Sequence, residues 1–418
     1  MSRPSPLQAV HESLGASFTD FGGWSMPVRY SSDLAEHHAV RQAAGIFDIS
    51  HMAEFTVSGA CSGQFLDYAL AGRLSALKVG KAKYSLVLAE DGGIIDDVIV
   101  YRLADDRFLV IANAGNREAV RNALSARTST GPSTGPSTGS GQATGQATGQ
   151  AAATGGFRGV LLGDVTDLYA LIAVQGPAAE AILAGTAGIT GVSVPWGEQR
   201  YYAWADATFA GAPLLIARTG YTGEDGFELL IPNAQAAALW QAVTDAGAPH
   251  GLVPCGLAAR DTLRLEAGMP LYGHELTLDV IPAQAGLGRV VVDTGDFVGR
   301  AALEPRPDAP VLVGLTAEGR RAGRAGYGVY RGEERVGEIT SGALSPTLGH
   351  PIALAYLSAA STGPSTGPST GPSTGSGQAT GQATGQAAAT GEDLTIDVRG
   401  TRIPASITDL PFYRRERS

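Results

Sequence analysis

The sequence contains very little cysteine, and its charge is not that of a nucleic-acid-binding protein. Only Cys61 and Cys255 occur among 418 residues, and neither lies in a CxxC or Cys/His cluster, so neither a disulfide framework nor a zinc site is indicated. Lys and Arg number 30 against 40 Asp and Glu, a net charge of −10. This excess of acid argues against nucleic acid or an anionic membrane as the main partner.

Long apolar runs and the common catalytic signatures are also missing. No stretch is apolar enough to span a bilayer, and the N-terminal MSRPSPLQAVHESLG lacks the apolar run of a signal peptide, so we expect a cytoplasmic protein. There is no GxxxxGK[ST] phosphate loop, no HExxH and no GxSxG. With 44% hydrophobic residues, the chain can still form a sizeable core.

Two segments have a composition that does not suit a packed fold. Residues 129–155 and 361–391 carry nearly the same text, STGP tetrads followed by STGSGQATGQATGQAAATG. Without large apolar side chains, such segments bury too little surface to offset the entropy lost on ordering. We expect both to be flexible inserts; natural low-complexity expansion and engineered addition both fit the repetition.

The rest of the chain mixes helical and strand patterns and ends in a run of strands. Helical patterns cover 33–43, 62–71, 116–126, 177–184, 234–247 and 255–267, with strand patterns between them. From about residue 286 short strands follow one another, beginning with GRVVVDTG. This order predicts an α+β body and an all-β, barrel-like C-terminal domain.

Two adjacent carboxylates interrupt an apolar strand pattern in GGIIDDVIVYRL, residues 92–103. Side chains alternate faces along a strand, so Asp96 shares a face with Ile94, and Asp97 shares the other with Ile95. One carboxylate should therefore point inward, which is costly unless it meets a donor or a ligand. The alternative is an edge strand with one solvated carboxylate and one that caps a turn.

Two further segments place charged side chains inside apolar patterns. RTGYTGEDGFELLIP, residues 218–232, is a glycine-rich turn that leads Glu228 into an apolar strand; the plainer interpretation is a hairpin with an outward Glu. CGLAARDTLRLEAGMPLYGHEL, residues 255–276, contains a helix that carries Arg260. Here the plainer interpretation is an exposed helix with an ordinary ion pair three residues apart.

Taken together, these segments resemble one family. FTDFGGWSMPVRYSSDLAEHHAVRQAAGIFDISHM resembles the N-terminal signature of the glycine cleavage system T-protein, the folate-dependent aminomethyltransferase. GGIIDDVIV, ALIAVQGP, GYTGEDGFEL, GLAARDTLRLEAGMPLYGHEL and GEITSGALSPTLGHPIALAYL follow in the family's order, and LPFY ends the match. The resemblance covers nearly all of the chain outside the inserts. Arg289 departs from the family's usual aromatic or bulky residue, and Arg300 replaces a common Lys.

The resemblance implies a cloverleaf of three domains around a central folate cavity. It assigns residues 1–50 and 156–250 to a first α+β domain, and 51–127 and 251–285 to a second. Residues 286–418 would form the barrel-like third domain. The first insert would then lie on the surface at a crossing between domains.

The resemblance also implies a reaction. In the family a lipoylated H-protein carries an aminomethyl group, and tetrahydrofolate accepts the one-carbon unit to give 5,10-methylenetetrahydrofolate, ammonia and dihydrolipoyl H-protein. Such a transfer requires an oriented nucleophile, a proton acceptor and stabilisation of positive charge at the methylene. The resemblance implies no metal.

Individual site residues follow by match to the family motifs. Asp96 is expected to be the catalytic carboxylate and to point into the folate cavity, whereas its neighbour on the opposite face is expected to be structural or solvated. Glu228 resembles the acid that holds the polar edge of the pterin, and Arg260 resembles the folate-site arginine. Tyr84 and Tyr413 are matched as aromatic or hydroxyl contacts to the folate.

Two other activities belong to relatives of the same fold. Some are folate-dependent demethylases, alone or fused to flavin oxidoreductases, and this chain has no fused flavin domain. Another relative is a non-catalytic folate-binding protein of iron–sulfur maturation, with a KGC-type motif as its hallmark. Cys255 precedes GLAARDTLRLEAG and lies outside such a motif. The aminomethyltransferase interpretation therefore fits the sequence best.

Overall fold

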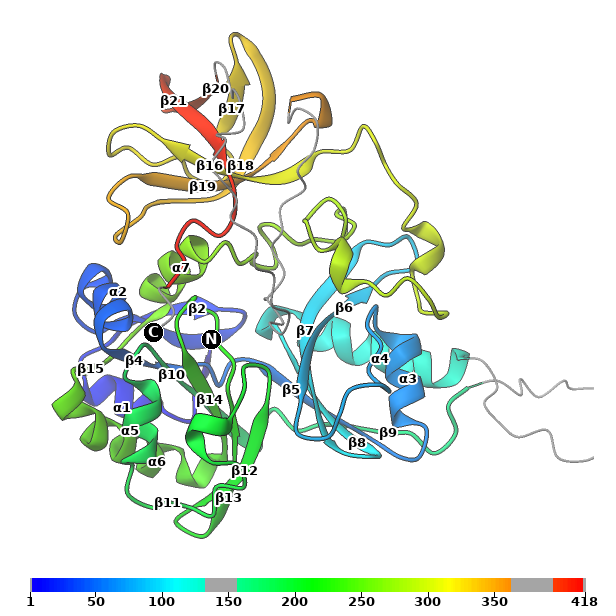
Figure 1. Ribbon diagram of the computed structural model, residues 1–418, viewed down its shortest axis with the longest axis vertical. Coiled ribbons are helices and arrows are strands. Elements are labelled where there is room, and N and C mark those ends of the chain that lie inside the picture. The colour runs from blue at the N-terminus through cyan, green and yellow to red at the C-terminus, as the bar shows by residue number, and fades with distance from the viewer. Residues whose placement is uncertain (1, 132–155, 362–393, 416–418) are drawn as a thin grey trace, which may run out of the picture.

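The computed structural model describes residues 2–131, 156–361 and 394–415, and these form three lobes (Figure 1). The mixed α+β organisation with a closed C-terminal β-barrel is confirmed. The predicted inserts lie almost entirely outside the described residues. Within the described ranges, no helix is both long and apolar enough to cross a membrane.

The first lobe is a seven-stranded sheet with helices against one face (Figure 1). In spatial order its strands are β11 (Ile189–Thr190), β12 (Trp204–Phe209), β13 (Ala212–Ala217), β14 (Gly226–Pro232), β10 (Tyr169–Gln175), β4 (Ala44–Asp48) and β15 (Leu252–Pro254). The helices are α1 (Gln8–Ser13), α5 (Ala179–Ala184) and α6 (Asn233–Gly247). In α6, Ala236, Leu239, Trp240 and Val243 recur at helical spacing and are buried in this core.

The second lobe is a five-stranded sheet with two helices on its outer face. In spatial order its strands are β6 (Ala82–Leu88), β7 (Ile94–Ala104), β8 (Arg107–Ala112), β5 (Ala53–Ser58) and β9 (Leu161–Asp164). Helices α3 (Ser62–Ala69) and α4 (Arg117–Thr130) cover the outer face. There Phe65 and Leu124 of the helices share a core with Val98 and Val100 of β7.

The inner faces of these two sheets pack against each other. Phe47, Leu171 and Leu230 of the first lobe belong to the same buried cluster as Tyr101 and Ile111 of the second. The long central strand β7 is therefore buried on both faces, toward the helices on one side and toward the other sheet on the opposite side.

The third lobe is the barrel, which a pair of helices joins to the first lobe. Its strands, in order around the barrel, are β16 (Val311–Ala317), β19 (Pro351–Leu357), β18 (Glu334–Leu344), β17 (Gly328–Arg331), β20 (Leu394–Val398) and β21 (Thr401–Thr408). Helix α7 (Leu257–Glu266) contacts β18 and β19, and it also packs on α2 (Asp33–Gln42). A small sheet of β1 (Arg3–Pro4), β3 (Trp24–Arg29) and β2 (Ser17–Phe21) lies beside α7.

The structure departs from the sequence predictions at three places. Strand β9 joins the sheet of the second lobe, although its residues fall within the range predicted for the first domain. The predicted strand GRVVVDTG is wrong, because residues 288–290 form a 3₁₀ turn there instead. This stretch also packs on β6 and the β6–β7 hairpin, through Leu287 and Phe297, and the barrel begins only at Val311.

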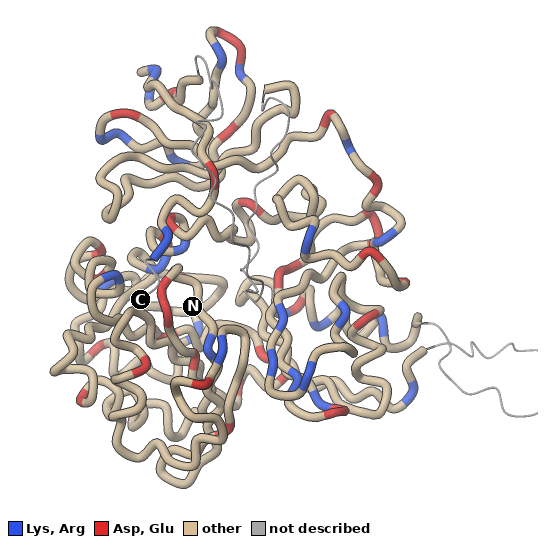
Figure 2. The backbone as a smooth tube through the Cα atoms, viewed as in Figure 1, with Lys and Arg blue, Asp and Glu red and all other residues tan. Residues whose placement is uncertain are grey.

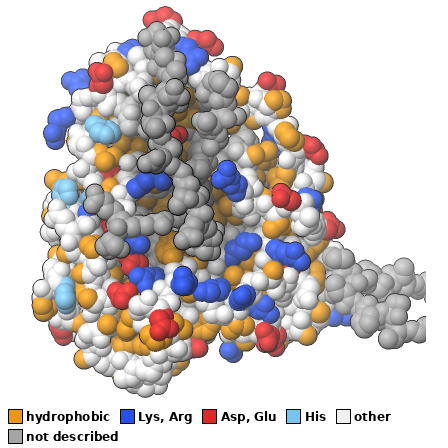
Figure 3. Space-filling model, viewed as in Figure 1, with side chains coloured by type: hydrophobic (Ala, Val, Ile, Leu, Met, Phe, Trp, Pro, Cys, Tyr) orange, Lys and Arg blue, Asp and Glu red, His pale blue; other side chains and the backbone are white. Residues whose placement is uncertain are grey.

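Charge is spread over all three lobes. Figure 2 shows both signs in the barrel and in each sheet lobe. On the face seen in Figure 3, Lys and Arg side chains gather in the lower middle, whereas Asp and Glu are more scattered. The net negative charge of the chain therefore does not make every surface acidic.

The base of the first insert is closed by hydrogen bonds, which makes its removal testable. Gly156 N donates to Gly131 O (2.8 Å) and Phe157 N donates to Thr128 O (2.8 Å). Replacing residues 132–155 by two glycines gives this Gly131–Gly156 bond the spacing of a β-turn. We expect the melting temperature to change by no more than about 2–4 °C, measured by circular dichroism.

A control variant shows whether the same measurement detects damage at this site. Phe157 is 3% exposed and packs in the core of the second lobe. Phe157→Ala should lower stability by about 3–5 kcal/mol. A comparable loss after the loop replacement would contradict the view that residues 132–155 add nothing to the core.

Candidate active site

A cavity lies where the two sheets face each other beside α7. Its polar lining includes Tyr84, Asp97, Glu228 and Arg260, and Ile49, Ile111 and Leu171 are among its apolar walls. None of its lining residues belongs to the barrel, so within the described part of the chain the site is built by the first two lobes and α7. Three of the site residues expected from the sequence, Tyr84, Glu228 and Arg260, therefore line one cavity.

Strand register brings the cavity residues of the second lobe together. Tyr84 of β6 pairs with Ile99 of β7, and Ile99 pairs with Ile111 of β8, so the three form one row across the sheet. Asp97 precedes Ile99 by two residues and lies on the same face. Strand β8 ends beside Asp97, and the residue that follows it, Asn113, lines the cavity.

The Asp97 carboxylate faces this cavity and is held by two donors. Tyr84 Oη donates to Oδ2 (3.0 Å), and Asn113 Nδ2 donates to Oδ1 (2.8 Å). Burial raises the pKa of Asp97 above its usual value, although these two hydrogen bonds act in the opposite direction. The result is an oriented carboxylate at the cavity wall that takes up a proton more readily than an exposed aspartate.

Asp96 lies on the other face of β7, and the expected face assignment is wrong. Its side chain is fully buried and accepts from Asn113 N (2.9 Å), Asn113 Nδ2 (2.8 Å) and Asn116 Nδ2 (2.6 Å). These donors stand at the turn that leads into α4. Alternation along the strand was predicted correctly, but both faces of β7 are apolar, so the pattern did not show which face meets the cavity.

Glu228 enters the cavity from β14 in the first lobe. Its neighbours Phe227 and Leu229 are fully buried, and Glu228 itself is only 9% exposed. Thr219 Oγ1 donates to Glu228 Oε2 (2.5 Å), and Tyr101 Oη lies 3.1 Å from the same threonine hydroxyl. Burial raises the pKa of Glu228, while the Thr219 hydrogen bond and the Arg260 charge oppose the rise.

Arg260 approaches the cavity from the first half of α7. Its guanidinium lies 4.8 Å from the centre of the Tyr221 ring, and its Nη1 atom is buried without a hydrogen-bond partner. Burial lowers the pKa of Arg260, and the Glu228 charge counteracts this. Among the ion pairs of the described residues, none joins Arg260 to Glu228, so both groups remain available to a third partner.

Tyr413 does not line this cavity. Its ring lies over the guanidinium of Arg41, 4.0 Å from Cζ to the ring centre, and its backbone N donates to Glu266 O (2.8 Å). The C-terminal segment therefore packs against α2 and α7 outside the cavity. The expected contact of Tyr413 with folate has no support in this geometry.

Two cavity residues were not singled out from the sequence. Tyr221 lies within the quoted GYTGEDGFEL, and its hydroxyl donates to Pro270 O (2.5 Å). Asn113 ends the strand FLVIAN, and its amide bridges both aspartates. A polar residue directly after an apolar strand was the available signal for Asn113, but its partners depend on pairing across the sheet.

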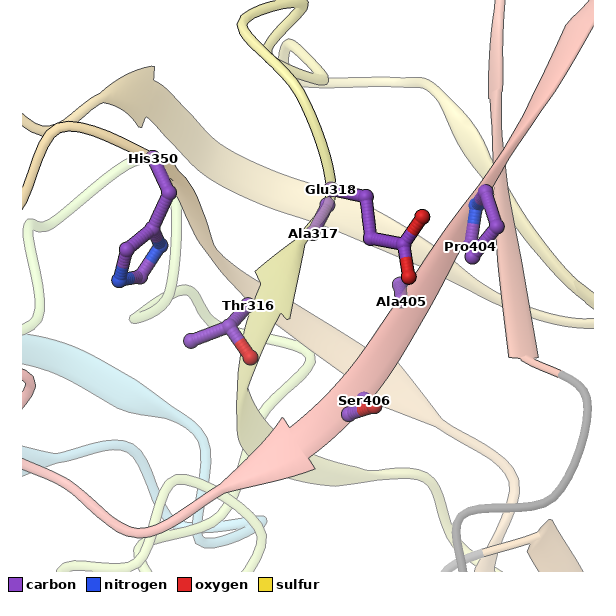
Figure 4. A pocket seen from close by; sticks show the side chains of 7 residues that line it. All are labelled: Thr316, Ala317, Glu318, His350, Pro404, Ala405 and Ser406. Atoms are coloured by element: carbon purple, nitrogen blue, oxygen red, sulfur yellow. The ribbon is translucent and has the colours of Figure 1, made fainter.

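A second hollow lies on the barrel, away from these residues. Figure 4 shows His350 and Glu318 beside Thr316 and Ser406 at the edges of β16 and β21. Its one carboxylate, Glu318, is exposed, so nothing there resembles the buried charges of the first cavity. In the described ranges, no group of three or more His, Cys, Asp or Glu side chains is placed to hold a metal ion.

Comparisons with known proteins agree with this architecture. The GCVT N-terminal domain matches residues 7–294, and the glycine cleavage T-protein C-terminal barrel domain matches residues 311–414. An aminomethyltransferase of Cutibacterium acnes is 50% identical over 420 residues, covering 99% of this chain and 99% of the relative. One from Streptomyces avermitilis is 48% identical over 425 residues, with 99% and 98% covered.

A solved structure extends the agreement to the fold. The crystal structure of glycine cleavage system aminomethyltransferase T from Bartonella henselae matches with a TM-score of 0.78 at 32% identity, covering 99% of this chain and 98% of that one. These relatives favour the aminomethyltransferase interpretation over the demethylase and the non-catalytic alternatives. The chain therefore belongs to the glycine cleavage T-protein family of aminomethyltransferases.

Proposed function

We propose that the cavity between the two sheets binds the folate of the aminomethyltransferase reaction, with its pterin between Glu228 and Arg260 and its reacting nitrogens beside Asp97. The observation that supports this most is the pair of buried charges, Glu228 and Arg260, which face one apolar cavity without forming an ion pair with each other. A ligand with donors and acceptors along one edge satisfies both.

The residues present fit a folate. A pterin is a flat heterocycle with adjacent N–H donors and an acceptor oxygen, and it suits a cavity whose walls are Ile49, Ile111, Leu171 and the Tyr221 ring. A carboxylate such as Glu228 accepts from N–H groups only, whereas the free Nη1 of Arg260 only donates. Tetrahydrofolate supplies the nitrogen nucleophiles that receive the one-carbon unit.

We assign to Asp97 the role that the sequence suggested for Asp96. Its two donors, Tyr84 and Asn113, fix the carboxylate in one orientation at the cavity wall. There it accepts a proton from the attacking nitrogen and stabilises positive charge at the methylene. Asp96 instead holds the turn before α4 in place.

The one-carbon donor in this proposal is the aminomethyl group on the lipoyl arm of H-protein. The decisive assay mixes the enzyme with tetrahydrofolate and aminomethyl-loaded H-protein and measures ammonia and 5,10-methylenetetrahydrofolate. Formation of neither product would refute the activity. A cytoplasmic location and the exclusion of nucleic acid and membrane as partners stay predictions.

Exchanging one aspartate at a time separates the two carboxylates. Asp97→Asn keeps the shape but removes the proton acceptor, so kcat should fall by roughly 10² to 10⁴ with little change in melting temperature. In Asp96→Asn an amide N–H replaces one acceptor oxygen and faces at least one of the donors that bind Asp96, so stability should fall by roughly 1 to 3 kcal/mol while much of the turnover remains. An inactive Asp96→Asn beside an active Asp97→Asn would reverse the assignment.

The pH dependence of kcat/KM tests the same carboxylate. The acceptor is present above the pKa of Asp97 and is lost as pH falls through it, and burial raises that pKa above the ordinary 3.8. We therefore expect an acidic limb with its midpoint above 3.8. Glu228→Gln should retain the limb, and the residual activity of Asp97→Asn should lack it. A limb that persists in Asp97→Asn would assign the titration to another group.

Glu228→Gln tests the pterin contact. Glutamine presents a donor on one side, so one pterin N–H loses its acceptor and folate binding should weaken by roughly 1 to 3 kcal/mol. Isothermal calorimetry measures the affinity, and circular dichroism confirms that the variant is folded. Wild-type affinity would show that Glu228 does not contact the folate.

A further inference from the structure

Arg41 lies in the last turn of α2 and joins several segments that are far apart in sequence. Its side chain is only 5% exposed. Nη1 donates to Thr222 O (2.7 Å) and Glu224 Oε1 (2.9 Å), while Nε and Nη2 donate to Glu266 Oε2 (3.1 and 2.8 Å). The guanidinium thus ends between a loop of the first lobe and the C-terminal end of α7.

The loop on one side of Arg41 forms the part of the cavity around Glu228. It runs between β13 and β14 and carries Thr219, whose hydroxyl donates to Glu228, and Tyr221, which lines the cavity. Gly220 lines the cavity as well, and a side chain there would collide with Gln175. Arg41 fixes the outer half of this loop through the Thr222 carbonyl and the Glu224 carboxylate.

The helix on the other side of Arg41, α7, carries Arg260, the second charged residue of the cavity. Glu266 ends α7, and Arg260 lies on the same helix six residues earlier. Glu266 is fully buried, and hydrogen bonds from Thr347 and Ser345 of the barrel converge on it. Any shift of α7 relative to the loop changes the distance between Arg260 and Glu228.

We propose that Arg41 is a positioning residue of the folate site, which sets the separation between Glu228 and Arg260 without touching the cavity. The inference rests on the proposed function, because the separation matters only if one ligand bridges both groups. Tyr413 contributes to this positioning, since its ring covers one face of the Arg41 guanidinium. The C-terminal segment thereby acts on the site through Arg41.

The planar fork of the guanidinium is what the arrangement requires. The hydrogen bonds from Arg41 to Thr222 and Glu224 on one side and to Glu266 on the other leave through three different nitrogens. A lysine ammonium keeps the charge but cannot reach the loop and Glu266 with the same geometry. Arg41→Lys therefore separates position from charge.

The test measures tetrahydrofolate affinity of the full chain by calorimetry. Arg41→Lys should weaken binding by about tenfold to a hundredfold, because a displacement on the order of 1 Å is enough to disturb such a site. The matched control is Arg117→Lys, since Arg117 pairs with Asp164 and Asp167 in the second lobe, away from the loop and α7. It should bind folate as the wild type does. Equal folate affinity in wild type and Arg41→Lys would overturn the proposal.

A double-mutant cycle separates positioning from a merely structural role. If Arg41 acts by placing Glu228 and Arg260, the folate-binding losses of Arg41→Lys and Glu228→Gln should not multiply, and Arg41→Lys should cost less in the Glu228→Gln background. Losses that multiply fully would reject positioning.

A milder variant covers the case in which Arg41→Lys is poorly folded. Glu224→Gln removes the charged partner on the loop and leaves Glu266 in place. Like Arg41→Lys, it should weaken folate binding. An unchanged folate affinity would count against the positioning role of Arg41. If Glu228→Gln alone leaves the affinity of the wild type unchanged, the proposed pterin contact fails, whatever the Arg41 variants do.

Discussion

The packing of the barrel against α2 and α7 depends on one buried carboxylate, that of Glu266. Burial alone would raise its pKa, but hydrogen bonds from His37 and Ser345 and the charge of Arg41 lower the pKa to about 2. These donors come from α2 and from the barrel, so satisfying a single charge fixes both against α7. A buried ion pair is weak evidence for net stability, but removing one partner leaves an uncompensated charge. The interaction therefore specifies geometry more than it adds stability.

At the candidate site, unlike at Glu266, buried charged groups are not fully paired. Arg260 retains an unpartnered Nη1, and the hydrogen-bond donors recorded for Glu228 are the neutral hydroxyls of Thr219 and Tyr101. Burial shifts the pKa of each group toward its neutral form, and the charge of the other group counteracts this only in part. Incompletely satisfied charges beside an apolar cavity are typical of sites whose remaining partner is a ligand. Glu266 and Arg260 lie on the same helix, α7, so the fully hydrogen-bonded carboxylate helps to position one of the two charges at the cavity.

Much of this was predictable from sequence, and the failures have physical reasons. Period-two and helical patterns located β7, α6 and α7, and the charged interruptions at Glu228 and Arg260 marked the cavity. Which of Asp96 and Asp97 faces the cavity was not predictable, because helices bury one face of β7 and the second sheet buries the other. The position of Tyr413 depends on how the tail returns from the barrel to α7, which no local pattern encodes.

The two aspartates cannot be considered separately, although their faces differ. Asn113 Nδ2 donates to Asp96 Oδ1 and to Asp97 Oδ1, both at 2.8 Å, so one amide connects the structural carboxylate to the one at the cavity. Burial raises the pKa of both, and the charge of Asp97 raises that of Asp96 further. The two carboxylates therefore lose their protons in two steps, and neither step can be assigned to one residue alone. The negative charge of Asp97 makes Asp96 harder to ionise, and the Asn113 amide holds both carboxylates, so the charge at the cavity wall depends on both aspartates and not on Asp97 alone.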